Sequence, residues 1–141
     1  MATSLDIARV AAMAADDKRA TDIVVIDLIG KTDVCDYFVV CTGNNNRQVD
    51  AIVDEVRTKV GKNCDLSPIS CEGREGLRWV LVDYGSVVIH VFTPEMRDFY
   101  RLERLWGDAP RVSLELEGAM DETDVVYEAD PSRIEPSEDD E

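Results

Sequence analysis

The chain has 141 residues, of which 45% are hydrophobic and 32% charged, and its formal net charge is −15 at pH 7. This length provides one hydrophobic core of modest size and argues against a second domain. The negative charge argues against nucleic acid or an anionic membrane as the main partner, because both would repel the protein. From residue 107 onward, 13 acidic residues stand against two arginines, so residues 1–106 are only mildly acidic.

The sequence shows no apolar run of transmembrane length and no signal-like segment, which predicts a cytoplasmic protein without a membrane partner. Its four cysteines lack the two-residue spacing that zinc and dithiol redox motifs use, and a single histidine removes most metal sites. We therefore expect four reduced thiols, mostly buried, and neither a metal nor a cofactor.

The first half of the chain predicts a helix, two strands and a second helix. Apolar residues at helical spacing predict a helix that opens at Ser4 and runs to about residue 17. Residues 23–29 and 37–41 are short apolar runs, the first typical of an interior strand, and their short connection indicates a hairpin. Asn44–Asn46 can cap a further amphipathic helix that ends at Gly61.

The middle of the chain predicts a weak edge strand followed by a β-hairpin. Residues 65–71, which include a proline, predict the edge strand. Residues 79–83 and 86–92 are rich in β-branched and aromatic side chains and flank Tyr84-Gly85, a connection of hairpin length. If Asp83 faces Ser86, antiparallel pairing puts Trp79 opposite His90.

Alternation along this hairpin predicts two different faces. One face consists of branched aliphatic residues, as expected of a sheet face buried under helices: Val80, Val82, Val87, Ile89 and Val91. The other face combines aromatic residues with the only histidine of the chain: Trp79, Leu81, Val88, His90 and Phe92. This second face either contacts water or a partner protein or packs under a loop or second helix layer, and the pattern leaves both possibilities open.

A third helix is predicted after the hairpin, with Thr93 and Pro94 at its start and Gly107 as its stop. Its buried stripe is predicted to contain Met96, Phe99, Leu102 and Trp106, and its solvated side Arg97, Arg101 and Arg104. Residues 111–116 predict a small added strand. We draw a domain boundary after residue 109 and expect the acidic residues 110–141 to form a disordered tail.

Catalytic signals are weak. The Thr42-Gly43 turn before a predicted helix is a possible anion cradle, but it lacks the glycines and lysine of a phosphate loop. Asp27, Asp36 and Asp83 lie near predicted strand ends, yet no two of them form the paired carboxylates of a two-metal site. A metal-dependent nucleotidyltransferase or other nucleotide-binding enzyme is the alternative function, and a structural dimeric adaptor is a third.

Several motifs together resemble the ribosomal silencing factor family (RsfS, or Iojap), over about residues 4–107. They are DYFVVCTG at 36–43 with Arg47-Gln48, WVLVDYG at 79–85, VIHV at 88–91, and RDFY at 97–100 leading into LERLW at 102–106. The sequence departs from the family pattern at Asn44–Asn46, where members more often carry small hydroxyl residues, and in its acidic tail.

The resemblance implies an α/β fold like that of nucleotidyltransferases, a mixed sheet of about five strands with flanking helices, without transferase activity. It also implies binding to the large ribosomal subunit through large-subunit ribosomal protein fourteen, which sterically prevents joining of the small subunit and represses translation when nutrients are scarce. The protein-binding residues it implies are Trp79, Tyr84, His90, Phe92, Arg97 and Tyr100. A homodimer is expected as well, with the predicted edge strand as one way to pair.

Overall fold

The computed structural model describes residues 2–100, 109–114, 116, 118 and 119, and of residues 98–100 only the backbone. Its elements are α1 (Ser4–Asp17), β1 (Thr21–Asp27), β2 (Tyr37–Thr42), α2 (Asn46–Cys64), β3 (Ser70–Glu72), β4 (Trp79–Asp83), β5 (Val87–Phe92) and α3 (Pro94–Tyr100). The strands form one sheet in the order β1-β2-β5-β4-β3, with β2 and β5 parallel and the other pairs antiparallel. This confirms the predicted mixed five-stranded sheet with flanking helices.

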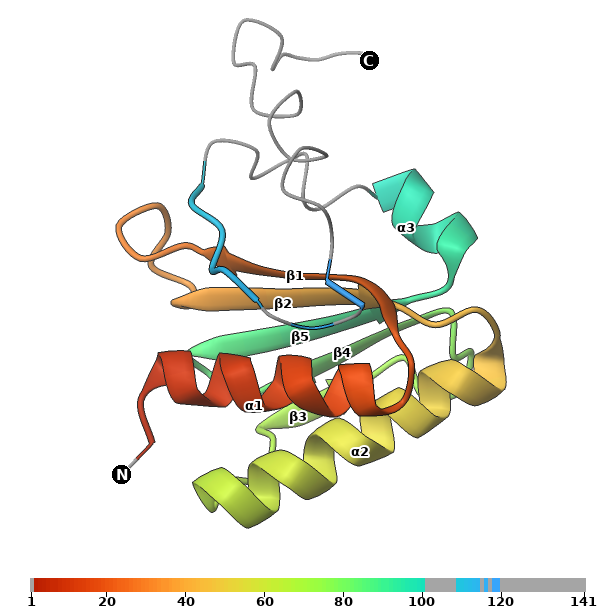
Figure 1. The fold of residues 1–141 in the computed structure, drawn as a ribbon, viewed down its shortest axis with the longest axis horizontal. Coiled ribbons are helices and arrows are strands. Elements are labelled where there is room, and N and C mark those ends of the chain that lie inside the picture. The colour runs from red at the N-terminus through yellow and green to blue at the C-terminus, as the bar shows by residue number, and fades with distance from the viewer. Residues whose placement is uncertain (1, 101–108, 115, 117, 120–141) are drawn as a thin grey trace, which may run out of the picture.

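The elements form layers on both sides of the sheet (Figure 1). Helices α1 and α2 cover one face, and α3 lies on the opposite face. The parallel pair of β2 and β5 requires a crossover, which the chain makes through α2, β3 and β4. Among the described helices, none combines the length and the apolar character that crossing a membrane requires.

Both long helices begin at side chains that cap them. Thr3 and Asp6 form a capping box, in which the Asp6 amide donates to Thr3 Oγ1 at 3.1 Å and the Thr3 amide to the Asp6 carboxylate at 3.0 Å. Asn45 caps α2 by accepting the Gln48 amide at 2.8 Å. The predicted end of α2 at Gly61 is wrong, because the helix continues to Cys64, and the left-handed Asp65 ends it.

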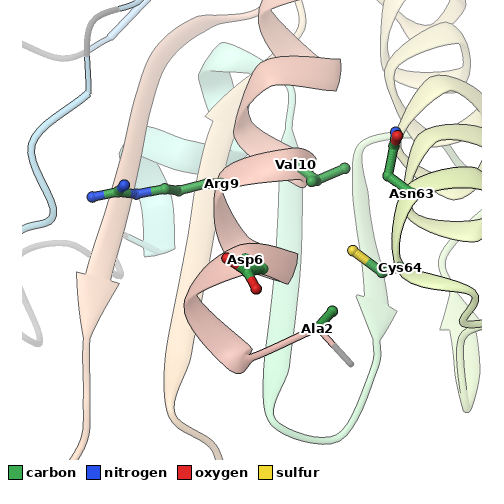
Figure 2. Close-up of a pocket in the computed structure, with 6 residues that line it drawn as sticks. All are labelled: Ala2, Asp6, Arg9, Val10, Asn63 and Cys64. Carbon is green, nitrogen blue, oxygen red and sulfur yellow. The ribbon is translucent and has the colours of Figure 1, made fainter.

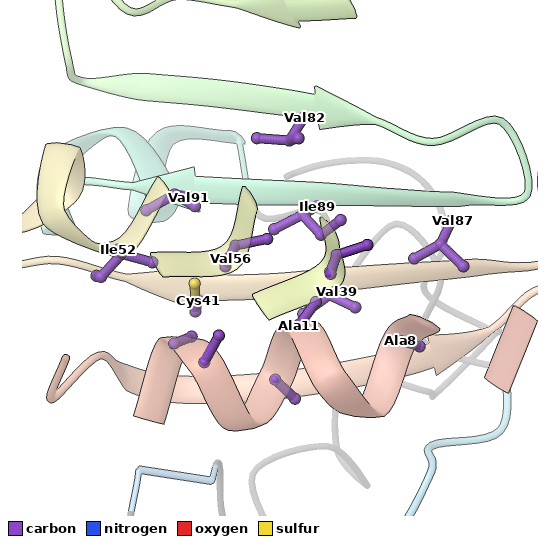
Figure 3. Close-up of a cluster of buried hydrophobic side chains, with 14 of the residues drawn as sticks. Ala8, Ala11, Val39, Cys41, Ile52, Val56, Val82, Val87, Ile89 and Val91 are labelled. Atoms are coloured by element: carbon purple, nitrogen blue, oxygen red, sulfur yellow. The ribbon is translucent and has the colours of Figure 1, made fainter. Parts of the chain in front are cut away.

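The main core lies between the two long helices and the sheet (Figure 3). Small alanines of α1 and branched side chains of α2 meet the strand residues predicted for this face: Val80, Val82, Val87, Ile89 and Val91, all fully buried. The predicted helix-covered face is therefore confirmed. Burying each valine or isoleucine contributes about 1.5–3 kcal/mol, so this layer supplies much of the free energy of folding.

The predicted register of the hairpin is wrong by two residues. Asp83 pairs with Val88 rather than Ser86, and Trp79 pairs with Phe92 rather than His90. The reason is the turn, in which the Tyr84 amide donates to the Val87 carbonyl at 2.9 Å and so continues the pairing one residue beyond Asp83. A shift of two residues leaves every side chain on its original side of the sheet, so the two faces were assigned correctly.

Strand β1 is an edge strand and not the predicted interior strand. Its continuous apolar sequence is explained by described residues between 109 and 119, which contact its outer edge through isolated bridges at Arg111 and Ala119. The predicted strand at 111–116 is present only in this reduced form. The boundary after residue 109 stays a prediction, and residues 101–108 and 120–141 lie outside the described residues.

Candidate protein interface

A second apolar cluster occupies the sheet face opposite α1 and α2. Its buried members are Val24, Ile26, Leu28, Cys35, Val40, Val88, Phe92 and Ala109, and its partly buried members are Phe38, Trp79, Leu81 and Met96. The central strand β5 is therefore buried on both faces. We call the partly buried set Phe38, Trp79 and Leu81, together with the His90 and Phe92 side chains beneath it, the aromatic face.

The rings of the aromatic face contact one another closely. Trp79 stacks on its cross-strand partner Phe92, with ring centroids 5.1 Å apart and planes inclined by 22°. Phe38 meets the His90 ring edge-on at 4.6 Å. Such pairs add about 0.5–1.5 kcal/mol each beyond their burial, so the half-buried rings are held in defined positions by the buried ones.

His90 is a buried, neutral acceptor at the centre of this face. It is 4% exposed, and burial lowers its pKa to about 4. Its Nδ1 accepts the indole N–H of Trp79 at 3.2 Å, which leaves the ring proton on Nε2. That Nε2 atom is buried and has no hydrogen-bond partner within the described part of the chain.

Two of the predicted site residues lie elsewhere than expected. Tyr84 was expected to join the apolar patch from the adjoining turn, but it is 8% exposed and its side chain packs in the core on the α1 and α2 side of the sheet. Tyr84 directly follows β4 and continues its alternation, in which the even-numbered residues Val80 and Val82 point to the helix side. Burial raises the pKa of Tyr84 to about 12.

Arg97 was predicted on the solvated side of the third helix, and it is 6% exposed. Its guanidinium donates to the Asp22 carbonyl at 2.6 Å and to the Thr42 hydroxyl at 2.9 Å. Arg97 thus ties α3 to the ends of β1 and β2. Tyr100 is the last residue of α3, and its side chain lies outside the described residues.

Sequence reasoning missed Phe38, which completes the aromatic face. Phe38 pairs with Val88 on β5, two residues before His90, and this adjacency depends on the parallel pairing of β2 with β5. Alternation along β2 could have assigned Phe38 to a face of the sheet, because Phe38 and Val40 point to the opposite side from Tyr37 and Val39. Which strand lies beside β5 is a property of the topology and could not be read from that alternation.

Polar groups at the Thr42-Gly43 turn form hydrogen bonds within the protein. The Gly43 amide donates to the Phe92 carbonyl at 2.8 Å, and the Asn44 amide donates to the Gln48 side chain at 2.6 Å. The Thr42 hydroxyl accepts Arg97. An anion would have to displace these bonds, so the geometry gives no support to the phosphate cradle of the alternative function.

The three aspartates near the strand ends each accept a hydrogen bond from another residue of the protein. Asp27 accepts the Ile29 amide at 3.0 Å, and Asp83 accepts the Gly85 amide at 2.7 Å. Asp36 accepts the Ser4 hydroxyl at 2.7 Å. The described residues contain no group of three or more histidine, cysteine or acidic side chains placed to hold a metal ion.

A pocket of about 440 Å³ opens between the start of α1 and the end of α2 (Figure 2). It is lined by Ala2, Asp6, Arg9, Val10, Asn63 and Cys64. Burial, together with the Asp6 carboxylate, raises the pKa of the Cys64 thiol. A thiol that stays protonated is a poor nucleophile, so Cys64 lacks the activation of a catalytic cysteine.

Known proteins resemble this chain over most of its length. A family model described as "Ribosomal silencing factor during starvation" matches residues 1–140. The ribosomal silencing factor RsfS of Bacillus subtilis is 47% identical over 109 residues, which cover 77% of this chain and 92% of that protein. The chloroplastic protein Iojap of Zea mays is 34% identical over 103 residues, covering 73% of this chain and 44% of that protein.

A solved structure shows the same fold. The crystal structure of a Chromobacterium violaceum protein superposes with a TM-score of 0.72 and 36% identity, covering 84% of this chain and 97% of that one. The match extends over most of both chains, so it includes the sheet and its helices. With the family model covering nearly the whole sequence, the chain belongs to the ribosomal silencing factor family.

Proposed function

We propose that this protein represses translation by binding the large ribosomal subunit through large-subunit ribosomal protein fourteen and sterically blocking the small subunit. This is a binding role in the cytoplasm, and no residue is assigned to catalysis or to a cofactor. Membership of the family supports the ribosomal part of the proposal. We assign the aromatic face as the surface that binds the ribosomal protein.

The observation that supports this surface is the half-buried Trp79 held on buried Phe92 and His90. A large aromatic side chain with fixed orientation and an exposed part is the usual anchor of a protein interface. Phe38 and Leu81 extend the apolar area around this anchor.

The experiment compares two substitutions of the same kind on opposite faces. Leu81→Lys places a charge in the centre of the aromatic face, and Met13→Lys places one on α1, where Met13 is 56% exposed on the far side of the sheet. Loss of a central contact typically costs more than about 2 kcal/mol of binding, or roughly thirtyfold in affinity. We expect Leu81→Lys to lose cosedimentation with isolated large subunits and to permit subunit joining, while Met13→Lys does neither.

Melting temperatures of both variants show that they are folded under the assay conditions. A folded Leu81→Lys protein that still binds large subunits and still blocks joining would place the interface elsewhere. Binding of the unchanged protein to joined ribosomes as well as to isolated large subunits would contradict the steric mechanism itself.

We also propose that the protein forms a homodimer through β3. This strand is an edge of the sheet that no other described strand pairs with on its outer side; it is three residues long, and Ile69 just before it is 73% exposed. Exposed strand edges are commonly protected by pairing with a second copy. Sedimentation equilibrium at micromolar concentration should give the dimer mass, and Ile69→Lys should shift it toward the monomer; a strictly monomeric protein would contradict this arrangement.

A further inference from the structure

The outer edge of β1 is covered from Ile23 to Asp27 by described residues of the same chain that lie between Pro110 and Ala119 (Figure 1). The Asp27 amide donates to the Pro110 carbonyl at 2.8 Å, the Val112 amide to the Val25 carbonyl at 2.9 Å, and the Ile23 amide to the Gly118 carbonyl at 2.8 Å. These bonds use outward-facing backbone groups of Ile23, Val25 and Asp27. Residues 110–112 pair antiparallel with β1 as an additional strand would, and the chain meets β1 again at Ala119 through an isolated parallel bridge.

Side chains of the same segment are partly buried against the core between the helices and the sheet. These side chains are Val112, Leu114 and Leu116. The segment is thus held by backbone bonds and by apolar contact together.

Gly118 fixes the far end of the segment. Its amide donates to the Asp16 carboxylate at 2.9 Å, and a Cβ added at this position would lie 2.2 Å from the Ala20 carbonyl oxygen. Any larger residue would have to move away from the loop between α1 and β1. A residue other than glycine at this position would therefore weaken the contact of the segment with the loop and with β1.

We propose that the outer edge of β1 is a strand-docking site and that residues 110–119 occupy it, closing it to a second copy of the chain. An open edge pairs readily with another strand. A sheet with two open edges can pair with another copy at each edge and so form an open-ended oligomer. A sheet with one open edge can form only a dimer in this way. The inference rests on the sheet order and these hydrogen bonds and is independent of the proposed ribosomal function.

The test uses full-length protein with weakened docking. Gly118→Val introduces the clash with Ala20, and Val112→Pro removes the amide that donates to Val25. The matched control is Gly76→Val, because a Cβ at Gly76 meets nothing within 4 Å. Amide hydrogen exchange and sedimentation velocity are measured on each protein, and the melting temperature shows that it is folded.

We expect the Ile23 and Asp27 amides to exchange at least about tenfold faster in Gly118→Val than in the control, since their acceptors are carbonyls of the segment. The Val24 and Ile26 amides, which alternate toward β2, should stay protected. The sedimenting mass of the variant should also rise with concentration beyond that of the unchanged protein. If Gly118→Val does not fold, the milder Val112→Pro provides the same comparison.

A labelled peptide with the sequence of residues 110–119 tests the docking site directly. It should bind the variant that carries both substitutions and not the unchanged protein, whose site is occupied. Absence of peptide binding to the folded double variant would overturn the docking site. Faster exchange of Ile23 and Asp27 without any change in mass would overturn the role of the segment in closing the edge.

Discussion

The indole N–H of Trp79 donates a hydrogen bond of 3.2 Å to Nδ1 of His90, although the two residues are diagonal rather than opposite across the hairpin. The bond requires an unprotonated Nδ1, so it exists only with neutral histidine. His90 is thus a buried acceptor that positions Trp79, and the orientation of the tryptophan depends on the charge of the histidine.

Stability should therefore depend on pH through His90. Its pKa is about 4 in the folded protein and 6.5 ordinarily, so between these values the unfolded chain binds more protons. The stabilising contribution is fully present above about pH 6.5 and is lost as pH falls toward 4. We expect about 2 kcal/mol of the free energy of unfolding, measured by urea denaturation, to be lost between about pH 7 and pH 5 because of this group.

The control for this prediction is His90→Asn, which keeps an acceptor near the position of Nδ1 but does not titrate. Carboxylates elsewhere contribute equally to both proteins, so the difference between the two pH profiles isolates His90. Identical profiles for the unchanged protein and His90→Asn would show that the histidine does not have a lowered pKa.

Trp79→Phe separates ring stacking from hydrogen bonding. Phenylalanine can still stack on Phe92, but it leaves the buried Nδ1 of His90 without its donor, which costs about 1–3 kcal/mol of stability. The same substitution made in a His90→Phe background should cost less, because no acceptor then remains. A double-mutant cycle on unfolding free energies measures the difference, and a coupling energy near zero would contradict the hydrogen bond.

Arg97→Ala should destabilise the fold rather than only a surface. It removes the donor to the Asp22 carbonyl and the Thr42 hydroxyl, and each acceptor left unsatisfied costs about 1–3 kcal/mol. Arg57→Ala, at an exposed position of α2, is the matched control and should stay within about 0.5 kcal/mol. Equal melting temperatures for the two variants would mean that α3 does not depend on Arg97.

The fold could be predicted largely because hydrophobic periodicity is local. Alternation along β4 and β5 assigned both faces correctly, even though the hairpin register was wrong by two residues. The edge position of β1 could not be predicted, because its apolar sequence is that of an interior strand. What covers it is a segment about 90 residues later in the chain, and contacts across such distances leave no local pattern.

The site was harder to predict than the fold, because parts of it depend on contacts between segments that are distant in the sequence. Trp79, His90 and Phe92 share a face because of alternation, and this part of the prediction is correct. Burial of Arg97 depends on acceptors from two other strands, and the recruitment of Phe38 depends on the strand order. Helical spacing predicted Arg97 on the solvated side of the third helix, but its hydrogen bonds to Asp22 and Thr42 bury it.

A substitution in the loop before β4 can displace Trp79 while every residue of the aromatic face keeps its identity. Gly73 has a φ of +92°, and a Cβ added there would lie 2.1 Å from the Trp79 carbonyl oxygen. The neighbouring Arg74 forms ion pairs with Asp50 and Asp54 on α2, so the loop is anchored to the helix layer.

Gly73→Ala should therefore both destabilise the protein and displace the start of β4. The left-handed backbone alone costs about 1–2 kcal/mol for alanine, and the clash adds to this because the ion pairs of Arg74 resist movement of the loop. Gly76→Ala is the control in the same loop, with open space around its Cβ, and should change stability by less than about 0.5 kcal/mol. Unfolding free energies measure the first effect, and the NMR resonance of the Trp79 indole N–H, which reports its bond to His90, measures the second. If Gly73→Ala matches Gly76→Ala in stability and leaves that resonance unchanged, the loop does not control the position of Trp79, and the orientation of the tryptophan depends on Phe92 and His90 alone.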